Sequence, residues 1–363
     1  MMKLLIVNTV PFTLDGINSV ILNYYRAMDK NDMQIDFVMI TQPYEEIKKE
    51  ISDNGGKIYV IHGRSRNPLS YVKQLFKIVK DGQYDIVHAH GNSCTLAFEM
   101  IAAKIGGARV RIPHSHNSNC KHKAMHTLLK PFFNRYYTHG FACGEKAGEW
   151  LYGKRKFTII NNGINLKNYL FSQQTRDMYR KKLNLIDKKV IGHVGNFIPR
   201  KNDLFLIDIF AELYKMDSSY RLLTIGDGKL KQEVQEKVAG IGLEEAVIFT
   251  GLRDDVPELM QAMDIFVLPS IFEGLPLTLI EAQSAGLPCV VSDKVSNEVK
   301  ITDLVEFISI DKSAAEWVKR IQIISIVDRK NTSEDIKTKI ASAGYSIDDN
   351  AKYLKKLYGK ISM

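Results

Sequence analysis

Two glutamates that bracket a glycine- and proline-containing segment are the residues whose types and spacing most strongly suggest chemistry. Glu273 follows a short apolar stretch, and Glu281 lies about two turns into a predicted helix over Leu277–Ala285. Gly274 and Pro276 stand at the helix entrance, where backbone amides have no partner within the helix. We therefore expect two carboxylates at different depths of one pocket. One would accept hydrogen bonds from sugar hydroxyls and the other from a ribose, while the amides between them face phosphate.

The simpler interpretation of this segment is structural. In it, Glu281 is buried against a core partner and Glu273 is merely a surface acid. Two acids on either side of a glycine–proline helix start are an unusual combination, so we favour the binding interpretation.

A second segment, Gly192–Asn202, joins a predicted strand to a predicted helix over Lys201–Lys215 and carries two adjacent cations, Arg200 and Lys201. Cations at a helix N-terminus are unfavourable against the helix dipole unless an anion lies between them, so the pattern favours a diphosphate site over a solvated basic patch. Gly226 follows the next predicted strand and is followed by a lysine at the start of a predicted helix, which loosely resembles the first arrangement. The same pattern is equally typical of an ordinary tight turn.

A third segment, Arg111–Ser118, places polar side chains directly after a buried strand. We expect its two histidines, His114 and His116, to point to opposite sides of the extended chain, so that only one faces a cleft and the two form no metal-chelating pair. Histidines satisfied by surface hydrogen bonds are an equally good interpretation of this segment taken alone.

Near the N-terminus, Asn8–Ile17 is predicted to be a loop between a first strand and a helix. Gly16 lies near the start of that helix, where backbone amides can approach a phosphate. The loop lacks the GxGxxG pattern, and a glycine in a turn usually serves only the turn. By itself this segment favours a structural role.

Both halves of the chain alternate short Val- and Ile-rich runs with longer amphipathic stretches, which is typical of parallel sheets covered by helices. Ligands of such sheets bind beyond the carboxyl ends of the strands, where the four segments above are found. Strands of the first half are predicted near Leu4–Asn8, Ile35–Ile40, Lys57–Ile61, Asp85–His88, Arg109–Pro113 and Gly140–Cys143, with helices near Asn18–Met28, Ser70–Lys80 and Thr95–Ile105. Those of the second half are predicted near Val190–Val194, Arg221–Ile225, Ala246–Thr250, Ile265–Leu268 and Pro288–Ser292, with helices near Lys201–Lys215, Lys229–Val238 and Leu277–Ala285.

The predicted fold class is therefore α/β, with two doubly wound, Rossmann-like parallel-sheet domains. The polar stretch Asn161–Asn165 is the predicted hinge. We place one domain over residues 1–163 and a second over 164–345. Apolar residues at helical intervals predict a last helix over 346–363 that crosses back to the N-terminal domain.

Composition narrows the class of protein. A chain of 363 residues, 45% hydrophobic and 25% charged, is long enough for two globular domains and is neither disordered nor fibrous. No apolar run is long enough to span a membrane, and the first residues predict a buried strand rather than a signal peptide. The four cysteines form no CxxC pair, which argues against a zinc site or a disulfide framework and favours a reducing cytoplasm.

The formal net charge of +9 is concentrated in the N-terminal half. Residues 1–165 contain 22 Lys and Arg against 13 Asp and Glu, and no acidic residue occurs between Glu99 and Glu145. One face of this half should be positive and meet an anionic partner. No nucleic-acid recognition motif accompanies the charge, so we do not expect a nucleic acid.

Apolar residues interleave with cations between residues 128 and 135, as a surface-lying amphipathic segment requires. An ordinary core helix with a solvated basic face would give the same pattern. The cations that we predict to face an anionic membrane surface are Lys121, Lys123, Lys130 and Arg135.

These segments together resemble the retaining nucleotide-sugar glycosyltransferases of family four, which have the GT-B architecture of two Rossmann-like domains facing a central cleft. The resemblance covers nearly the whole chain. Its most specific element is the Glu-x7-Glu signature, matched by Glu273 and Glu281. It implies that Glu273 contacts the donor sugar and that Glu281 holds the nucleotide ribose. Lys201, with Arg200 beside it, is similar to the cation that stabilises the departing diphosphate.

The resemblance also covers the weaker segments. His116 matches the family's active-site histidine, which hydrogen-bonds the donor sugar and is not a nucleophile. Gly16 is similar to the family's glycine loop, although a second glycine often present there is Asp15 here. Many members carry arginine where this chain has Asn196, so one phosphate contact is missing or comes from Arg200. The implied catalytic residues are His116, Lys201 and Glu273, and the implied donor-binding residues are Gly16, Asn196, Arg200, Lys201, Gly226, Glu273, Gly274, Leu275, Pro276, Leu277 and Glu281.

The chain is similar in particular to bacterial enzymes that build capsular or exopolysaccharide repeat units on a lipid carrier. This implies transfer of a hexose or N-acetylhexosamine, with a UDP-sugar as the expected donor, to a lipid-linked saccharide at the inner face of the cell membrane. The N-terminal domain would be the acceptor side and the C-terminal domain would bind the nucleotide sugar.

No Asp-x-Asp motif follows a predicted strand, so we expect neither cofactor nor metal, and cations with helix-end amides would balance the leaving diphosphate. A nucleotide-sugar epimerase or hydrolase on the same fold, and a non-catalytic partner of another transferase, stay open as alternatives.

Overall fold

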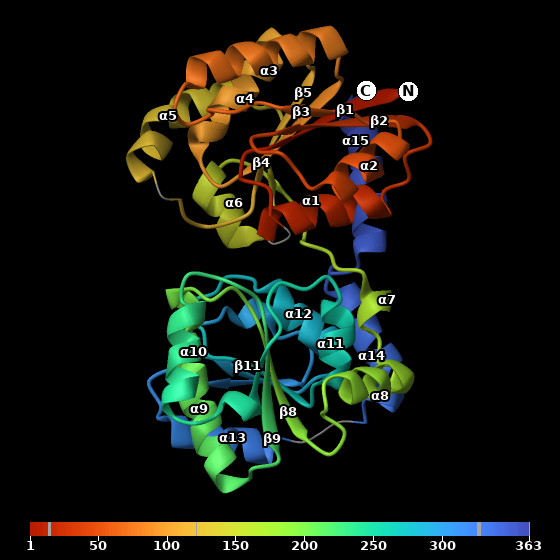
Figure 1. The fold of residues 1–363 in the computed structure, drawn as a ribbon. Coiled ribbons are helices and arrows are strands. Elements are labelled where there is room, and N and C mark those ends of the chain that lie inside the picture. Colours follow the sequence, from red (N-terminus) through yellow and green to blue (C-terminus); the bar gives the residue numbers. More distant parts are fainter. Residues whose placement is uncertain (14–15, 121, 325–327, 363) are drawn as a thin grey trace. The chain divides into compact units, whose positions relative to one another are not determined.

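The structure is a computed structural model that describes residues 1–13, 16–120, 122–324 and 328–362. The chain divides into two compact units. Unit 1 comprises Met1–Gly163 and Ile347–Met363, and unit 2 comprises Ile164–Ser346. Each unit is a parallel sheet with helices packed against it (Figure 1), so the predicted α/β fold class is confirmed.

The described part of unit 1 contains a seven-stranded sheet of order β3-β2-β1-β4-β5-β6-β7. Neighbouring strands pair in parallel throughout. The strand order reverses between β1 and β4, which is the position where ligands bind in open α/β sheets. The strands are β1 (Met2–Asn8), β2 (Met33–Met39), β3 (Ile58–Val60), β4 (Ile86–Gly91), β5 (Val110–Ser115), β6 (Phe141–Ala142) and β7 (Thr158–Ile159).

Helices cover both faces of the unit 1 sheet. Leu5 and Val7 of β1 pack in one core with side chains of α3 and α4, whereas α1 and α15 pack together, with Tyr358 of α15 contacting His88 of β4. The C-terminal segment therefore completes unit 1. Its helices are α1 (Gly16–Ala27), α2 (Glu45–Asp53), α3 (Pro68–Gly82), α4 (Ala97–Ile105), α5 (Lys123–Tyr136), α6 (Glu145–Tyr152) and α15 (Ile347–Ser362), with a 3-10 turn η1 (Cys94–Leu96).

Unit 2 contains, in its described residues, a six-stranded parallel sheet of order β10-β9-β8-β11-β12-β13. One core lies under α7, α8, α11, α12 and α14, and a second under α9, α10 and α13. The strands are β8 (Lys189–Val194), β9 (Tyr220–Ile225), β10 (Val247–Phe249), β11 (Ile265–Leu268), β12 (Cys289–Ser292) and β13 (Val305–Ile308). The helices are α7 (Leu166–Tyr169), α8 (Gln173–Lys182), α9 (Asp203–Met216), α10 (Lys231–Gly240), α11 (Val256–Ala262), α12 (Leu277–Ser284), α13 (Ala314–Ile323) and α14 (Arg329–Ser342), with 3-10 turns η2 (Pro199–Lys201), η3 (Glu244–Ala246) and η4 (Asn297–Val299).

The predicted start of one helix is wrong. Helix α9 begins at Asp203 and not at Lys201, because Asn202 adopts a left-handed conformation with φ of 61°. That residue separates α9 from η2, which carries Arg200 and Lys201. The two cations therefore do not occupy the first turn of the helix, and an argument from its dipole does not apply to them directly.

The described helices are all too short or too polar to cross a membrane. The four cysteines are free thiols.

Candidate functional site

An ion pair between Lys201 and Glu273 is the centre of the candidate site in unit 2. The Lys201 Nζ lies 2.9 Å from the Glu273 Oε1, and the two residues are only 7% and 8% exposed. A backbone hydrogen bond of 2.8 Å from Ile271 to the carbonyl of Arg200 ties the two loops together. The Arg200 Nε lies farther away, 3.9 Å from the same carboxylate oxygen, and this side chain is largely exposed.

Glu273 is therefore not the surface acid of the structural interpretation. It supplies the anion that the adjacent cations require, and the Lys201 charge is balanced before any ligand is present. A buried pair of this kind carries a large desolvation cost, and removing one partner would leave an uncompensated charge.

A second buried pair, His193 and Asp203, lies next to the first. The His193 Nδ1 lies 2.9 Å from the carbonyl oxygen of Val267 and must donate to it, since a carbonyl can only accept. The His193 Nε2 lies 3.3 Å from Asp203 Oδ1.

Gly195 lies against both pairs and presents only backbone atoms to them. A Cβ at this position would lie 3.1 Å from the Lys201 Cε and 3.2 Å from the His193 Nε2. Gly226, with φ of +145°, faces it, and a Cβ there would lie 2.0 Å from the Gly195 carbonyl oxygen. The loops after β8 and β9 thus meet without side chains, and the partly exposed Asn196 follows Gly195. Such a surface allows close approach of a phosphate.

Glu281, in α12, faces the phenol of Tyr169 at the end of α7. Burial raises the pKa of the Glu281 carboxyl to about 7, and the hydrogen bond with Tyr169 opposes this rise. Burial likewise raises the pKa of the Tyr169 hydroxyl well above its usual value. Glu281 therefore has the core partner foreseen by the structural interpretation, yet it stays partly exposed.

The segment between the two glutamates leads into α12 without a side-chain cap. Gly274 is exposed, and a Cβ there would meet nothing within 4 Å. Pro276 is the buried N-cap residue, while Leu275 and Leu277 pack partly buried against the core. The first amides of α12 are consequently available to a ligand.

In unit 1, four histidines gather at the carboxyl ends of β4 and β5. His88 and His90 come from β4, His114 from β5, and His116 follows β5 directly. The expectation that His114 and His116 point to opposite sides is wrong, because residues two apart in a strand share a face. Their rings stack with centroids 4.2 Å apart.

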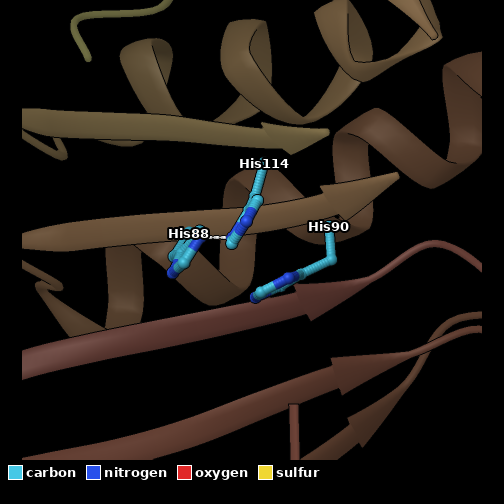
Figure 2. Close-up of side chains that lie close together, drawn as sticks. All are labelled: His88, His90 and His114. Carbon is cyan, nitrogen blue, oxygen red and sulfur yellow. Dashed lines mark hydrogen bonds between the residues drawn. The ribbon is translucent and has the colours of Figure 1, made fainter. Parts of the chain in front are cut away.

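Hydrogen bonds divide these four residues, which we call the histidine cluster, into two pairs. The His88 Nε2 lies 3.1 Å from the His114 Nδ1 (Figure 2), and the His88 Nδ1 lies 2.6 Å from the hydroxyl of Tyr358. The His90 Nδ1 lies 2.8 Å from the His116 Nε2.

Burial removes charge from the histidine cluster. It lowers the pKa of His88, His90 and His114 well below the usual value, and neighbouring imidazoles lower it further. Burial lowers the pKa of His116 to about 3, against a hydrogen bond with Asn162 that raises it. At neutral pH the cluster is a set of uncharged hydrogen-bonding groups.

Three members, His88, His90 and His114, form the group of possible metal ligands found among the described residues (Figure 2). One ring nitrogen from each lies within 4.8 Å of the others. His88 already uses both nitrogens in hydrogen bonds, so a metal ion would have to displace Tyr358 or His114. The expected absence of a metal stays a prediction.

The other predicted residues divide between the units. His116 and Gly16 belong to unit 1, where Gly16 begins α1 with φ of +53°; Asp15 lies outside the described residues. Lys123, Lys130 and Arg135 lie on α5, while Lys121 lies outside the described residues.

Sequence reasoning missed several residues of these clusters. They are Tyr169, His193 and Asp203 in unit 2, and His88, His90 and Tyr358 in unit 1. A pattern that could have revealed the histidine cluster is the pair of His-x-His motifs at the ends of neighbouring predicted strands.

Proteins of known fold and sequence family resemble this chain over most of its length. The fold is shared with HepE from Anabaena in complex with UDP, with a TM-score of 0.78, 17% identity, and coverage of 99% of this chain and 100% of that one. The two domains match two family models, Glycosyltransferase Family 4 over residues 14–168 and Glycosyl transferases group 1 over residues 175–341.

Two curated relatives cover most of the chain. EpsF of Bacillus subtilis, provisionally named a glycosyltransferase, is 32% identical over 359 residues, with 94% of this chain and 93% of EpsF covered. The UDP-Gal:alpha-D-GlcNAc-diphosphoundecaprenol alpha-1,3-galactosyltransferase of Escherichia coli is 29% identical, with 78% of this chain and 77% of that enzyme covered. The chain belongs to glycosyltransferase family 4 and has the GT-B fold.

Proposed function

We propose that this glycosyltransferase moves a hexose or N-acetylhexosamine from a UDP-sugar to a lipid-linked saccharide, with retention of configuration and without a metal ion. The buried Lys201–Glu273 ion pair is the observation that carries the proposal. It holds one cation and one hydrogen-bond acceptor beside the side-chain-free surface of Gly195 and Gly226, as a diphosphate joined to a sugar requires.

In this proposal, different residues of unit 2 bind different parts of the donor. The diphosphate lies against Lys201, Arg200 and the first amides of α12, which balance the charge that develops as the sugar departs. The sugar hydroxyls donate to Glu273, and the ribose hydroxyls donate to Glu281. Neither glutamate is assigned as a nucleophile, so attack occurs on the face that the phosphate leaves.

His116 contributes a neutral imidazole that hydrogen-bonds the donor sugar. Its pKa of about 3 makes it a poor proton acceptor at neutral pH. The leaving phosphate oxygen therefore takes the proton of the attacking acceptor hydroxyl. His90, whose Nδ1 lies 2.8 Å from the His116 Nε2, holds the imidazole in place.

The acceptor assignment is supported by the Escherichia coli relative, whose name specifies a diphosphoundecaprenol-linked acceptor. We propose a lipid-linked acceptor of this class for this chain, used in capsule or exopolysaccharide synthesis. The cations of α5 would hold unit 1 against the anionic inner face of the cell membrane, as a peripheral protein.

The donor proposal is tested first by thermal-shift binding of UDP, GDP and ADP without metal. We expect UDP to raise the unfolding temperature of the wild-type protein and to have little effect on Glu281→Ala. The apparent stability gained is about 2.7 kcal/mol when the ligand is at a hundred times its Kd. A wild-type protein that no nucleotide stabilises would favour the non-catalytic alternative.

The reaction itself is tested with a UDP-sugar and a lipid-linked acceptor, with NMR to read the anomeric configuration of the product. We expect retention, and the same rate with and without EDTA. Inversion would contradict the proposed geometry, and loss of activity restored by magnesium would contradict the metal-free mechanism. Release of free sugar or an isomer without acceptor would instead support the hydrolase or epimerase alternative.

A further inference from the structure

Helix α5 presents a row of apolar side chains to solvent. Met125, Leu128 and Phe132 are 40%, 65% and 52% exposed, and their spacing of three and four residues places them on one side of the helix. The core side of α5 is occupied by other residues, His126 and Phe133. The apolar row is thus additional to the side chains that anchor the helix, and a partner would bury it.

An open surface pocket of about 620 Å³, which we call the cavity, lies beside this row. Its lining consists of Thr127, Lys130, Pro131, Asn134, Arg135 and Arg155. Five of these residues belong to α5, whereas Arg155 follows α6. Three cations therefore converge from two segments of unit 1, and none of the described residues that line the cavity is acidic.

The charges in this cavity have no carboxylate partner in the described part of the chain. Among the residues that the structure describes, none of Lys130, Arg135 and Arg155 forms an ion pair with Asp or Glu, although Arg155 interacts with the hydroxyl of Tyr137. The carboxamide oxygen of Asn134 is buried and has no hydrogen-bond partner. A half-turn of that carboxamide would place an N–H donor at the same position. The cavity therefore offers cations and an amide group to an anion.

We propose that this cavity is a headgroup pocket, in which Lys130, Arg135 and Arg155 bind the phosphate of one anionic bilayer lipid. Met125, Leu128 and Phe132 then enter the boundary between headgroups and acyl chains. A phospholipid joins a phosphate to an apolar chain, and α5 joins a cationic cavity to an apolar row. The inference deepens the membrane part of the proposed function and rests on it, whereas the donor site in unit 2 does not depend on it.

A specific pocket and a diffuse basic face differ in which cations contribute most to membrane binding. Lys123 lies on α5 but does not line the cavity, while Arg155 lines the cavity from outside the helix. Diffuse attraction would weight each cation alike, at about fivefold in membrane partitioning per charge near an anionic surface. A pocket weights Arg155 above Lys123 and requires its planar guanidinium, which binds phosphate through two parallel N–H groups.

The test is flotation of the full chain with phosphatidylcholine vesicles that do or do not contain about one third phosphatidylglycerol. We expect binding to the anionic vesicles and at least a tenfold loss of partitioning for Arg155→Gln. Arg155→Lys should not restore it, and Lys123→Gln should lose about fivefold or less. Phe132→Ser should weaken binding by about tenfold. Both Arg155 and Phe132 are exposed, and the unfolding temperature of each variant checks its fold.

Three outcomes would overturn the headgroup pocket. Equal losses for Lys123→Gln and Arg155→Gln, or full rescue by Arg155→Lys, would show diffuse attraction. Stabilisation by inorganic phosphate without vesicle binding would assign the pocket to a soluble phosphate. Dimerisation that Phe132→Ser abolishes, again without vesicle binding, would assign the apolar row to a second copy of the chain.

UDP stabilisation measured on the same variants separates this inference from the donor proposal. If UDP stabilises the chain but anionic vesicles do not bind it, only the headgroup pocket falls. If the vesicles bind in the predicted order but UDP has no effect, the pocket stands and the donor proposal falls.

Discussion

The two units place different chemistry on similar sheets. At the carboxyl ends of β4 and β5, unit 1 carries the uncharged histidine cluster. Around the carboxyl ends of β8 and β11, unit 2 carries two buried pairs of ionisable groups, Lys201–Glu273 and His193–Asp203. The scaffold fixes where a site can form, and the side chains decide what it can bind.

The difference in charge has a physical consequence. Burying charges is costly, so a cluster that retains them is suited to a ligand that is itself charged. Neutral imidazoles avoid this cost and suit hydroxyl groups. The comparison therefore supports the proposal that the anionic diphosphate binds to unit 2 and that unit 1 contributes uncharged hydroxyl contacts.

The largest effect is expected from breaking the ion pair of unit 2. Lys201→Met should leave Glu273 charged and buried, which costs about 3–5 kcal/mol of the free energy of unfolding. It should also lower kcat by about 10²–10³, because the cation proposed to stabilise the leaving diphosphate is lost. Urea unfolding and the transfer assay measure the two effects. The double variant with Glu273→Gln should recover stability without activity, and recovered activity would contradict the proposed role of Lys201.

A smaller effect is expected at the base of the histidine cluster. Tyr358→Phe removes the hydroxyl 2.6 Å from the His88 Nδ1 and leaves a buried nitrogen without a partner. This should cost about 1–3 kcal/mol of the free energy of unfolding, measured with urea. Tyr353→Phe is the matched control, since Tyr353 lies exposed on the same helix. Equal stabilities for the two variants would show that the hydroxyl contributes nothing to the cluster.

The pH dependence of UDP binding tests Glu281. Its pKa is raised to about 7, so the carboxylate that we propose to accept ribose hydroxyls becomes protonated as the pH falls below that value. The Kd for UDP should rise by up to about tenfold per pH unit below 7. The raised pKa has the opposite effect on the stability of the free protein. Its free energy of unfolding falls as the pH rises toward 7, because ionisation of the buried carboxyl is unfavourable.

Glu281→Gln is the control for this measurement, because it keeps the shape of the side chain and removes its titration. We expect this variant to bind UDP more weakly and with a flatter pH profile. Calorimetry measures the Kd between pH 5.5 and 8, a range of about one to two units on either side of the pKa. An unchanged slope in the variant would assign the pH dependence to another group.

The smallest effect is predicted for titration of the histidine cluster. The lowered pKa values of its four members predict that none becomes charged between about pH 5 and 8. Histidine ring signals in NMR spectra, assigned by single His→Gln variants, measure this directly. A member that titrates within this range would remove the contrast between a neutral unit 1 cluster and a charged unit 2 cluster.

The sequence by itself determined the fold class and the segments that follow the strands. Strand and helix periods are local properties, so runs such as Val190–Val194 and Ile265–Leu268 could be placed to within about two residues. The Glu-x7-Glu spacing likewise identified the loop and helix that carry Glu273 and Glu281. Family membership follows from these same features together with the comparisons.

Only the tertiary structure decided which side chains meet. The pairing of Lys201 with Glu273 joins residues far apart in the chain, and so does the contact of Tyr358 with His88. Asn202 alone adopts the left-handed conformation that separates Arg200 and Lys201 from α9, and the periodicity of apolar residues does not predict it. The pKa values follow from burial and from neighbours on other elements, as at Glu281 beside Tyr169. The periodicity of apolar residues depends on residues close together in the sequence, whereas desolvation and pairing arise only when distant segments pack.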